Sequence, residues 1–434
     1  MSRGADSRAR RVDRAQNLTI CLLTLSLLLL VANLPLFGSL SDSSLIELAR
    51  ARLRRESDAP VVDRGGTPAL VFPVRIVYTN DYARVGSDAL TTVSDEFERA
   101  GAFLSEALGS ANGAVPVRDA AFLDALRGEG VYFDFTNALP AGLLSELLGV
   151  TVPDGADGAR RMLLAPANAE AVALYVQDGA GRCCRYFTGV SAAELADFLA
   201  TRGGESADFA FMLGEDYAQL SPYTLSLSPG APRAALSAAN ALAGNEDRIL
   251  RRAEFNAHTE NRFSESSGTV IVREAPNALY LSPDGTVDYL GGEAPPDSIC
   301  FVPSETDAPT LGEAAAAAQN LAVTLLQGLL GDAELYLSGA RTDGSRTEIS
   351  FDLMVDGTPL RLSDGAHAGA VTVEGRSITA FTFRVRSYTR QDAEPLLLPF
   401  AQAAAIARVY PGAELTVAYI DVGAEEVLPA WIAD

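Results

Sequence analysis

The strongest hydrophobic pattern in the chain is the apolar run over residues 18–38, which contains no charged side chain. A helix needs roughly 20 apolar residues to cross the hydrocarbon core of a bilayer. A cleaved secretory signal instead has an apolar core of about 7–15 residues and a small-x-small cleavage site, which Gly38 and Ser39 do not complete. Cys21 opens the run, and this position disfavours lipoprotein processing. We expect a retained transmembrane helix, with cleavage after export as the alternative.

The charges on each side of this run predict its orientation. The tail before it carries five Arg against two Asp, whereas Arg52, Arg54 and Arg55 lie well beyond its other end. Lys and Arg close to a span stay on the cytoplasmic side. We therefore predict a single-pass protein of the cell membrane, with a cytoplasmic N-terminus and an extracytoplasmic bulk.

After a predicted juxtamembrane helix and linker, the next part of the chain mixes helical and extended patterns. Apolar residues at three- and four-residue steps predict a long amphipathic helix, and shorter segments of the same type follow. Extended apolar runs predict strands between them. The helices are expected at residues 87–108, 141–149 and 191–202, and the strands at 69–80, 130–140 and 159–189, the last with a turn at 178–181.

The second half of the chain repeats one order of predicted elements: a long helix followed by short strands joined at tight turns. Helices are expected at residues 234–255, 311–331 and 391–410, and strands at 268–274, 277–283, 286–290, 333–343, 346–362, 369–390, 413–422 and 426–434. The recurrence suggests a duplicated helix-plus-meander unit. Short connections fit all-antiparallel sheets, which need no crossover loops.

The predicted fold class is therefore α+β: a single N-terminal transmembrane helix followed by extracytoplasmic units of antiparallel sheet, each packed with a long helix. We expect six segments: a cytoplasmic Arg-rich tail (1–17), the transmembrane helix (18–38), a juxtamembrane helix and linker (39–68), an N-terminal α+β domain (69–230), a middle helix-plus-meander domain (231–305) and a C-terminal α+β domain (306–434).

Several of these stretches resemble the YycH and YycI proteins, accessory membrane proteins of the cell-wall two-component system of Gram-positive bacteria. They are "VYFDFTNALPAGLLSELLG", "GTVIVREAPNALYLSPDGTVDYL", "ISFDLMVDGTPL" with "GAVTVEGRSITAFTFR", and "LTVAYIDVGAEEVLPAWIA". The resemblance implies a regulator of signal transduction at the cell envelope, which contacts a membrane sensor histidine kinase and a second YycH/YycI-type protein. The helix-plus-meander units are also similar to small inhibitory domains on exported proteases.

Composition narrows the chemistry. The chain has 434 residues, 48% of them hydrophobic, and a net charge of −22; its 34 cationic residues are all Arg, and it has two His. Without Lys there is no P-loop lysine, Schiff base or Ser–Lys pair, and no HExxH motif supports metal hydrolysis. An acidic exterior disfavours nucleic acid as a partner, because phosphate binding needs a basic face.

The densest carboxylate group is Asp95, Glu96 and Glu98, around Phe97. Two carboxylates about 5–9.5 Å apart in a cleft can hydrolyse a glycosidic bond. On the predicted helix, however, Phe97 faces the core, and we interpret the three acids as a solvated face.

Neither histidine has the neighbouring residues that a metal site or a catalytic site needs. His258 stands between acidic neighbours, where a His can titrate near neutral pH, but no third metal ligand follows at a suitable spacing. His367 lies in an expected turn, and "LSDGAH" lacks the G-x-S-x-G pattern of a nucleophilic serine. We interpret both as structural or surface residues.

The cysteines and the tryptophan do not indicate a functional site. Cys183 and Cys184 are adjacent and point to opposite faces of a strand, so at most one of them pairs with Cys300; we favour buried free thiols. Trp431, the only tryptophan, is expected to pack in a core, unless the terminal strand is an exposed edge that pairs with a partner.

The sequence thus predicts no enzyme, with no catalytic, cofactor-binding or metal residues and no cofactor. The expected function is a non-enzymatic regulator of a sensor histidine kinase that acts through span and exterior contacts. Within the span, Ser26 and Asn33 share a helical face, and an amide at Asn33 can hydrogen-bond to another helix. The alternative is an exported cell-envelope hydrolase or a ligand-binding module anchored at the membrane.

Overall fold

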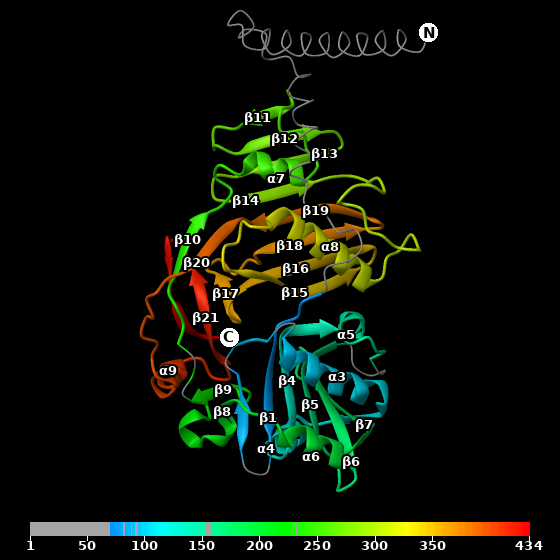
Figure 1. The fold of residues 1–434 in the computed structure, drawn as a ribbon, viewed down its shortest axis with the longest axis vertical. Helices are drawn as coiled ribbons and strands as arrows, with labels where there is room; N and C mark the ends of the chain where they lie inside the picture. Colours follow the sequence, from blue (N-terminus) through cyan, green and yellow to red (C-terminus); the bar gives the residue numbers. More distant parts are fainter. Residues whose placement is uncertain are drawn as a thin grey trace, which may run out of the picture. The chain divides into compact units, whose positions relative to one another are not determined.

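The computed structural model describes residues 70–80, 83–87, 89–91, 94–152, 158–228, 230 and 232–434. This part is mixed α+β, mostly sheet with several helices, as the sequence predicts (Figure 1). Residues 67–434 form one compact unit. No helix among the described residues is long and apolar enough to cross a membrane. The predicted tail, span and juxtamembrane segment, with Ser26 and Asn33, lie outside the described residues.

The first part of the unit is built on a nine-stranded sheet, here called sheet A, in the order β3-β7-β6-β5-β4-β1-β2-β8-β9. Every pairing in it is antiparallel. Its strands are β1 (Val74–Thr79), β2 (Arg84–Gly86), β3 (Asn112–Val117), β4 (Gly130–Pro140), β5 (Gly158–Pro166), β6 (Ala171–Gln177), β7 (Cys183–Ser191), β8 (Glu205–Phe209) and β9 (Leu225–Ser228).

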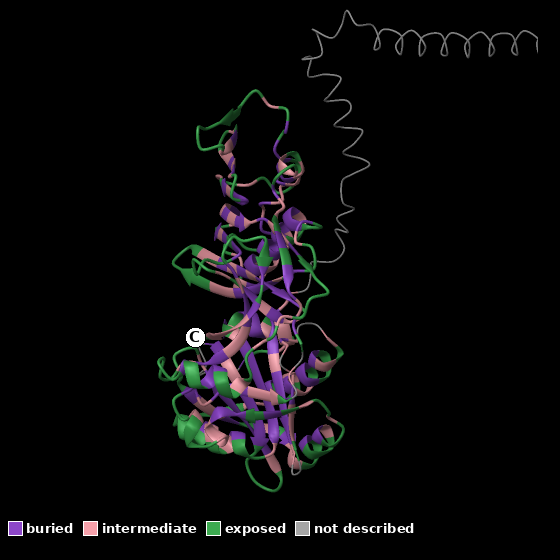
Figure 2. Ribbon diagram, turned by 90° about the vertical axis from the view of Figure 1, so that its left-hand side faces the viewer, coloured by how far each residue is buried: buried purple, intermediate pink, exposed green. Residues whose placement is uncertain are grey.

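Alternation along the strands divides sheet A into two buried faces. On β4, Val131 and Phe133 belong to a cluster with α3 (Asp95–Gly109), α5 (Ala141–Leu148) and α6 (Ala192–Ala200). Tyr132 between them belongs to a second cluster with α4 (Asp119–Arg127), against which the short helix η2 (Ala210–Met212) also packs. The short helix η3 (Glu215–Tyr217) follows η2 in the chain. Both faces of the central strand are therefore buried, as the purple strands of Figure 2 illustrate.

The second part of the unit is built on an eleven-stranded sheet, here called sheet C. Its order is β11-β12-β13-β14-β19-β18-β16-β17-β21-β23, with β15 paired to β16. The strands are β11 (Arg262–Ser264), β12 (Val270–Glu274), β13 (Asn277–Leu281), β14 (Thr286–Leu290), β15 (Glu334–Asp343), β16 (Arg346–Val355), β17 (Thr358–Leu362), β18 (Gly369–Glu374), β19 (Ser377–Arg384), β21 (Leu415–Asp421) and β23 (Pro429–Ala433).

Helix α8 (Leu311–Leu326) covers sheet C, and its alanine-rich face belongs to the same buried cluster as Phe351 and Phe381 (Figure 1). It begins with a capping box, in which Thr310 and Glu313 each bond the other's backbone N–H. A third sheet of three strands comprises β20 (Arg386–Arg390), β10 (Leu236–Asn240) and β22 (Glu426–Val427). The remaining helices are α7 (Glu246–Arg252) and α9 (Phe400–Ala407).

Four predicted helices are longer than the helices in the structure. The helix expected at 311–331 ends at Leu326. The helix expected at 234–255 is replaced by strand β10 and the short α7, because residues 236–240 pair with β20 and β22 and Gly244 adopts φ +77°. Helix α3 begins at Asp95, not at 87, since the Ser94 side chain caps it. Helix α9 spans only 400–407, because Pro399 immediately precedes it and fixes an extended φ/ψ.

One predicted sheet property is also wrong. Sheet C is not all antiparallel, since β17 and β21 pair in parallel, with Leu360 opposite Tyr419. The long connection through α9 makes this possible, because parallel strands need a crossover of a dozen or more residues.

Gly331, which follows α8, tests how tightly this helix is tied to β20. It has φ +69°, a conformation that L-residues rarely adopt, and a Cβ here would collide with the backbone of Tyr388. Gly365 has a similar φ of +73° but open space around it. We expect Gly365→Ala to cost about 1 kcal/mol of unfolding free energy and Gly331→Ala about 3 kcal/mol or more. Equal losses in urea titrations of the two variants would contradict this close approach.

Candidate functional site

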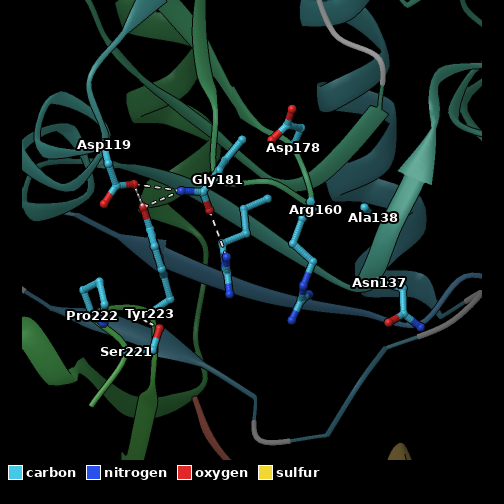
Figure 3. A pocket seen from close by; sticks show the side chains of 12 residues that line it. Asp119, Asn137, Ala138, Arg160, Asp178, Gly181, Ser221, Pro222 and Tyr223 are labelled. Atoms are coloured by element: carbon cyan, nitrogen blue, oxygen red, sulfur yellow. Dashed lines mark hydrogen bonds between the residues drawn. The ribbon is translucent and has the colours of Figure 1, made fainter. Parts of the chain in front are cut away.

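A hollow of about 690 Å³ lies on the second face of sheet A, where charged residues replace the apolar ones (Figure 3). On β4, Asp134 follows Tyr132 on the same face, and on β5 Arg161 precedes Leu163 by the same step of two. The hollow is lined by residues of α4, β4, β5 and β6 and of neighbouring loops, among them Asp119, Asn137, Arg160, Arg161, Gln177 and Tyr223.

Beneath the hollow lies an ionic cluster of three arginines and two carboxylates, here called the arginine cluster: Arg75, Arg160, Arg161, Asp134 and Glu414. Asp134 is bonded by Arg160 and lies 3.7 Å from Arg75 and 4.0 Å from Arg161. Glu414 accepts a 2.5 Å hydrogen bond from Arg161 and lies 3.7 Å from Arg160 and 3.8 Å from Arg75. Each carboxylate therefore contacts all three guanidinium groups.

The two carboxyl groups of the arginine cluster differ in acidity. Burial raises the pKa of Asp134, but the charges of Arg160, Arg161 and Arg75 outweigh it, and the pKa is lowered. Burial also raises the pKa of Glu414, and here the charge of Asp134 adds to it, so that the arginines do not restore the ordinary value. Of the two carboxyl groups, Asp134 is therefore the one whose ionised form the cluster stabilises.

Two uncharged side chains, Gln177 and Tyr223, connect the arginine cluster by hydrogen bonds to Asp119, in the first turn of α4. Arg161 donates to Gln177 Oε1 at 2.9 Å, and Gln177 Nε2 donates to Asp119 Oδ1 at 2.8 Å and to the Tyr223 hydroxyl at 2.9 Å. Tyr223 in turn donates to Asp119. The Arg161 guanidinium also stacks on the Tyr223 ring at 4.2 Å. A cation and an anion are therefore held one side-chain amide apart.

The C-terminal part of the chain closes one side of this site. Glu414 comes from the segment before β21, which is also held by backbone hydrogen bonds to the loop before β9: Ser221 N–H to Ala413 O at 2.8 Å and Gly412 N–H to Gln219 O at 2.7 Å. Leu415 N–H donates to Thr224 Oγ1. The hollow consequently depends on contacts between residues far apart in sequence.

The sequence analysis did not identify this site. Its signal was a charge inside an otherwise apolar strand, as with Asp134 in "VYFDFT" and Arg75 in "PVRIVYT". A buried charge is costly unless it is paired, so each of these residues implied an unseen partner. Nothing in the sequence around Glu414 indicates that it is that partner.

His367 lies near an acid and a serine, but the geometry is not that of a catalytic triad. Its Nδ1 lies 3.1 Å from Asp352 and 3.4 Å from Ser338 Oγ. In a triad the acid and the serine use different ring nitrogens. The hydrogen bond with Asp352 raises the pKa of His367. His258 lies apart from this pair, exposed after α7.

The other candidate residues have structural surroundings. Phe97 is buried as predicted, and Asp95 and Glu98 are exposed, but Glu96 is partly buried and bonded by Tyr78 and Arg99. Trp431 donates to Leu398 O at 2.7 Å and packs against the ring of Phe400.

Cysteine and metal chemistry receive no support from the geometry of the described residues. Cys183 and Cys300 are buried free thiols, as predicted, and Cys184 is half-buried. Burial raises the pKa of Cys183 and of Cys300 to about 11, so their thiolate forms are disfavoured. The described part of the chain contains no group of three His, Cys, Asp or Glu that could hold a metal ion.

Comparisons of the chain with protein-family models, curated proteins and solved structures give no match.

The two acids of the arginine cluster should respond differently to neutralisation. Asp134→Asn leaves three arginines with too little negative charge, and we expect a loss of about 3–5 kcal/mol. Glu414→Gln should cost less than Asp134→Asn, because burial and the charge of Asp134 raise the pKa of Glu414 and so disfavour its charged form. The lowered pKa of Asp134 gives stability that is present above its unfolded value of 3.8 and lost as the pH falls through the folded value.

The raised pKa of Glu414 has the opposite sign. Stability from this group is present below its unfolded value of 4.5 and is lost as the pH rises through the folded value. Glu414→Gln removes that loss, so its unfolding free energy should approach the wild-type value as the pH rises from about 5 to about 8. Urea titrations at the two pH values measure both effects, and equal losses for Asp134→Asn and Glu414→Gln throughout would rule out the assignment.

The pair of His367 and Asp352 should stabilise the fold mainly at low pH. Because the folded pKa is raised above the unfolded value of 6.5, the contribution is complete below that value and disappears as the pH rises through the folded pKa. His367→Gln should therefore destabilise the protein more at about pH 6 than at about pH 9. The same comparison in an Asp352→Asn background serves as the control, since there the pH dependence should vanish.

Proposed function

We propose that this protein is a non-enzymatic, membrane-anchored regulator that acts outside the cytoplasm by contact with a sensor histidine kinase of a two-component system. The span predicted at residues 18–38 is its anchor, and the part from residue 67 onward is its contact domain. The proposal includes the YycH/YycI resemblance and the duplicated helix-plus-meander origin of the C-terminal half.

The observation that carries the proposal is an apolar surface around α9. Leu396 is 98% exposed, Ile406 62%, Val409 72% and Tyr410 62%. Val409 and Tyr410 follow directly after the end of α9 at Ala407, while Ala403, Ala404 and Ala407 of the helix are buried against Leu220. Soluble surfaces rarely gather several large apolar side chains without a partner.

An open strand edge lies beside this surface. Strand β23 ends the order of sheet C and pairs with β21 on one side. Its Trp431 packs on Phe400, the first residue of α9. Apolar side chains next to a strand with free backbone groups suit a protein partner, which can add a strand and cover the side chains together.

The residues of the candidate site support a binding role better than a catalytic one. Its two buried acids are both paired with arginines, and Asp119 accepts hydrogen bonds from Gln177 and Tyr223 through Oδ1. An acid–base pair for glycoside hydrolysis needs one protonated and one free carboxyl group across a cleft. The described geometry supports a binding role better than a hydrolase.

The test combines charge insertion on the α9 surface with crosslinking in membranes. Ile406→Asp with Val409→Asp should reduce recovery of the kinase with the protein several-fold and change kinase-dependent transcription, because burying a carboxylate at a contact is costly. Phe263→Asp, at an exposed apolar residue of β11 that is 53% exposed, is the matched control and should change neither.

A variant with an unrelated membrane span separates the anchor from the exterior contact. If the wild type recovers no membrane kinase, or if the α9 variant and the Phe263 variant behave alike, the proposal fails.

A further inference from the structure

We propose that the hollow above the arginine cluster binds a small zwitterion of dipeptide size, with its carboxylate toward Arg160 and its ammonium group toward Asp119. The proposal rests on the residues of the hollow alone and is independent of the α9 surface.

The anion-binding side of the hollow is Arg160. A guanidinium group has five N–H donors, and Arg160 makes one hydrogen bond among the described residues, to Asp134, while its 3.7 Å approach to Glu414 is too long for another. Its side chain is 20% exposed, at the hollow. Asn137 lines the same side and is exposed (Figure 3); its Nδ2 donates to Ser338 O at 2.7 Å, which leaves its second N–H. These groups match the planar acceptor pair of a carboxylate.

The cation-binding side is Asp119, which Figure 3 shows across the hollow from Asn137. Gln177 and Tyr223 both donate to Oδ1, so the position of the carboxylate is fixed. Asp119 is exposed, and a carboxylate has about four acceptor sites. The first turn of α4 favours negative charge at this position. An ammonium group reaching Oδ2 would find a rigid, charged acceptor.

The volume of the hollow sets the size of the ligand. The volume of about 690 Å³ falls in the usual range of small-molecule pockets, about 300–1,000 Å³, and leaves space for side chains.

The test uses three probes with the same glycylglycine backbone, which differ in the charges that they carry at their ends. Glycylglycine carries both charges, N-acetylglycylglycine only the carboxylate, and glycylglycine amide only the ammonium group. Ligand-observed NMR or calorimetry with the purified full-length protein should give a dissociation constant for glycylglycine about tenfold or more below that of either capped probe.

Variants assign each charge to its side. Asp119→Asn should bring the affinity for glycylglycine down to that for the acetylated probe, and Arg160→Gln should bring it down to that for the amide. Because Arg160→Gln also disturbs the arginine cluster, Ala138→Glu is the second variant: Ala138 is exposed and lines the hollow, so the new carboxylate repels the anionic end while the cluster stays intact. Ala138→Gln, of the same size without the charge, is its matched control.

The zwitterion assignment is overturned by three results: no binding of glycylglycine, equal binding of the three probes by the wild type, or equal loss in Ala138→Glu and Ala138→Gln. Binding of the acetylated probe at full strength would mean that the hollow accepts an anion alone and that Asp119 has no part in recognition.

Discussion

Glu414 in the arginine cluster is the contact on which the arrangement of the described unit depends. It joins the segment before β21 to sheet A, where its hydrogen bond with Arg161 links residues 253 positions apart in the chain. Glu414 gives the arginines a second hydrogen-bond acceptor beside Asp134, and the backbone bonds of Gly412 and Ala413 hold it there. A cluster of this kind specifies one docking position, because any shift leaves a buried charge without its partner.

The same cluster explains why the hollow is polar although it lies on a sheet face. Farther along that face, α4 covers Tyr132 and Leu163 with Phe122 and Leu126. At the level of Asp134 and Arg161 the cover is instead the loop of Ser221 and Tyr223 with Glu414, and these groups do not fill the space. The hollow therefore lies where the apolar cover of this sheet face gives way to the arginine cluster.

Local patterns in the sequence predicted those elements whose structure is set by interactions between residues close together in the chain. Strand β4, helix α5, helix α6 and the turn at 178–181 agree with the structure, since alternation, capping and glycine act over a few residues. The helix expected at 234–255 fails because residues 236–240 gain strand partners from positions 386–390 and 426–427, which local propensity cannot reveal. The parallel pairing of β17 with β21 and the pairing of Asp134 with distant arginines fail to appear for the same reason.

One loop connects the hollow with the α9 surface. Residues 219–224 line the hollow through Ser221 and Tyr223, and Leu220 of the same loop packs under the alanines of α9. The loop is also bonded to Gly412 and Ala413, which lead from α9 to Glu414. If the proposed ligand shifted this loop, it would change the support of α9, and by linkage the proposed partner on α9 would change the affinity of the hollow by the same factor. The contact between the two halves of the unit thus supports both the hollow and α9.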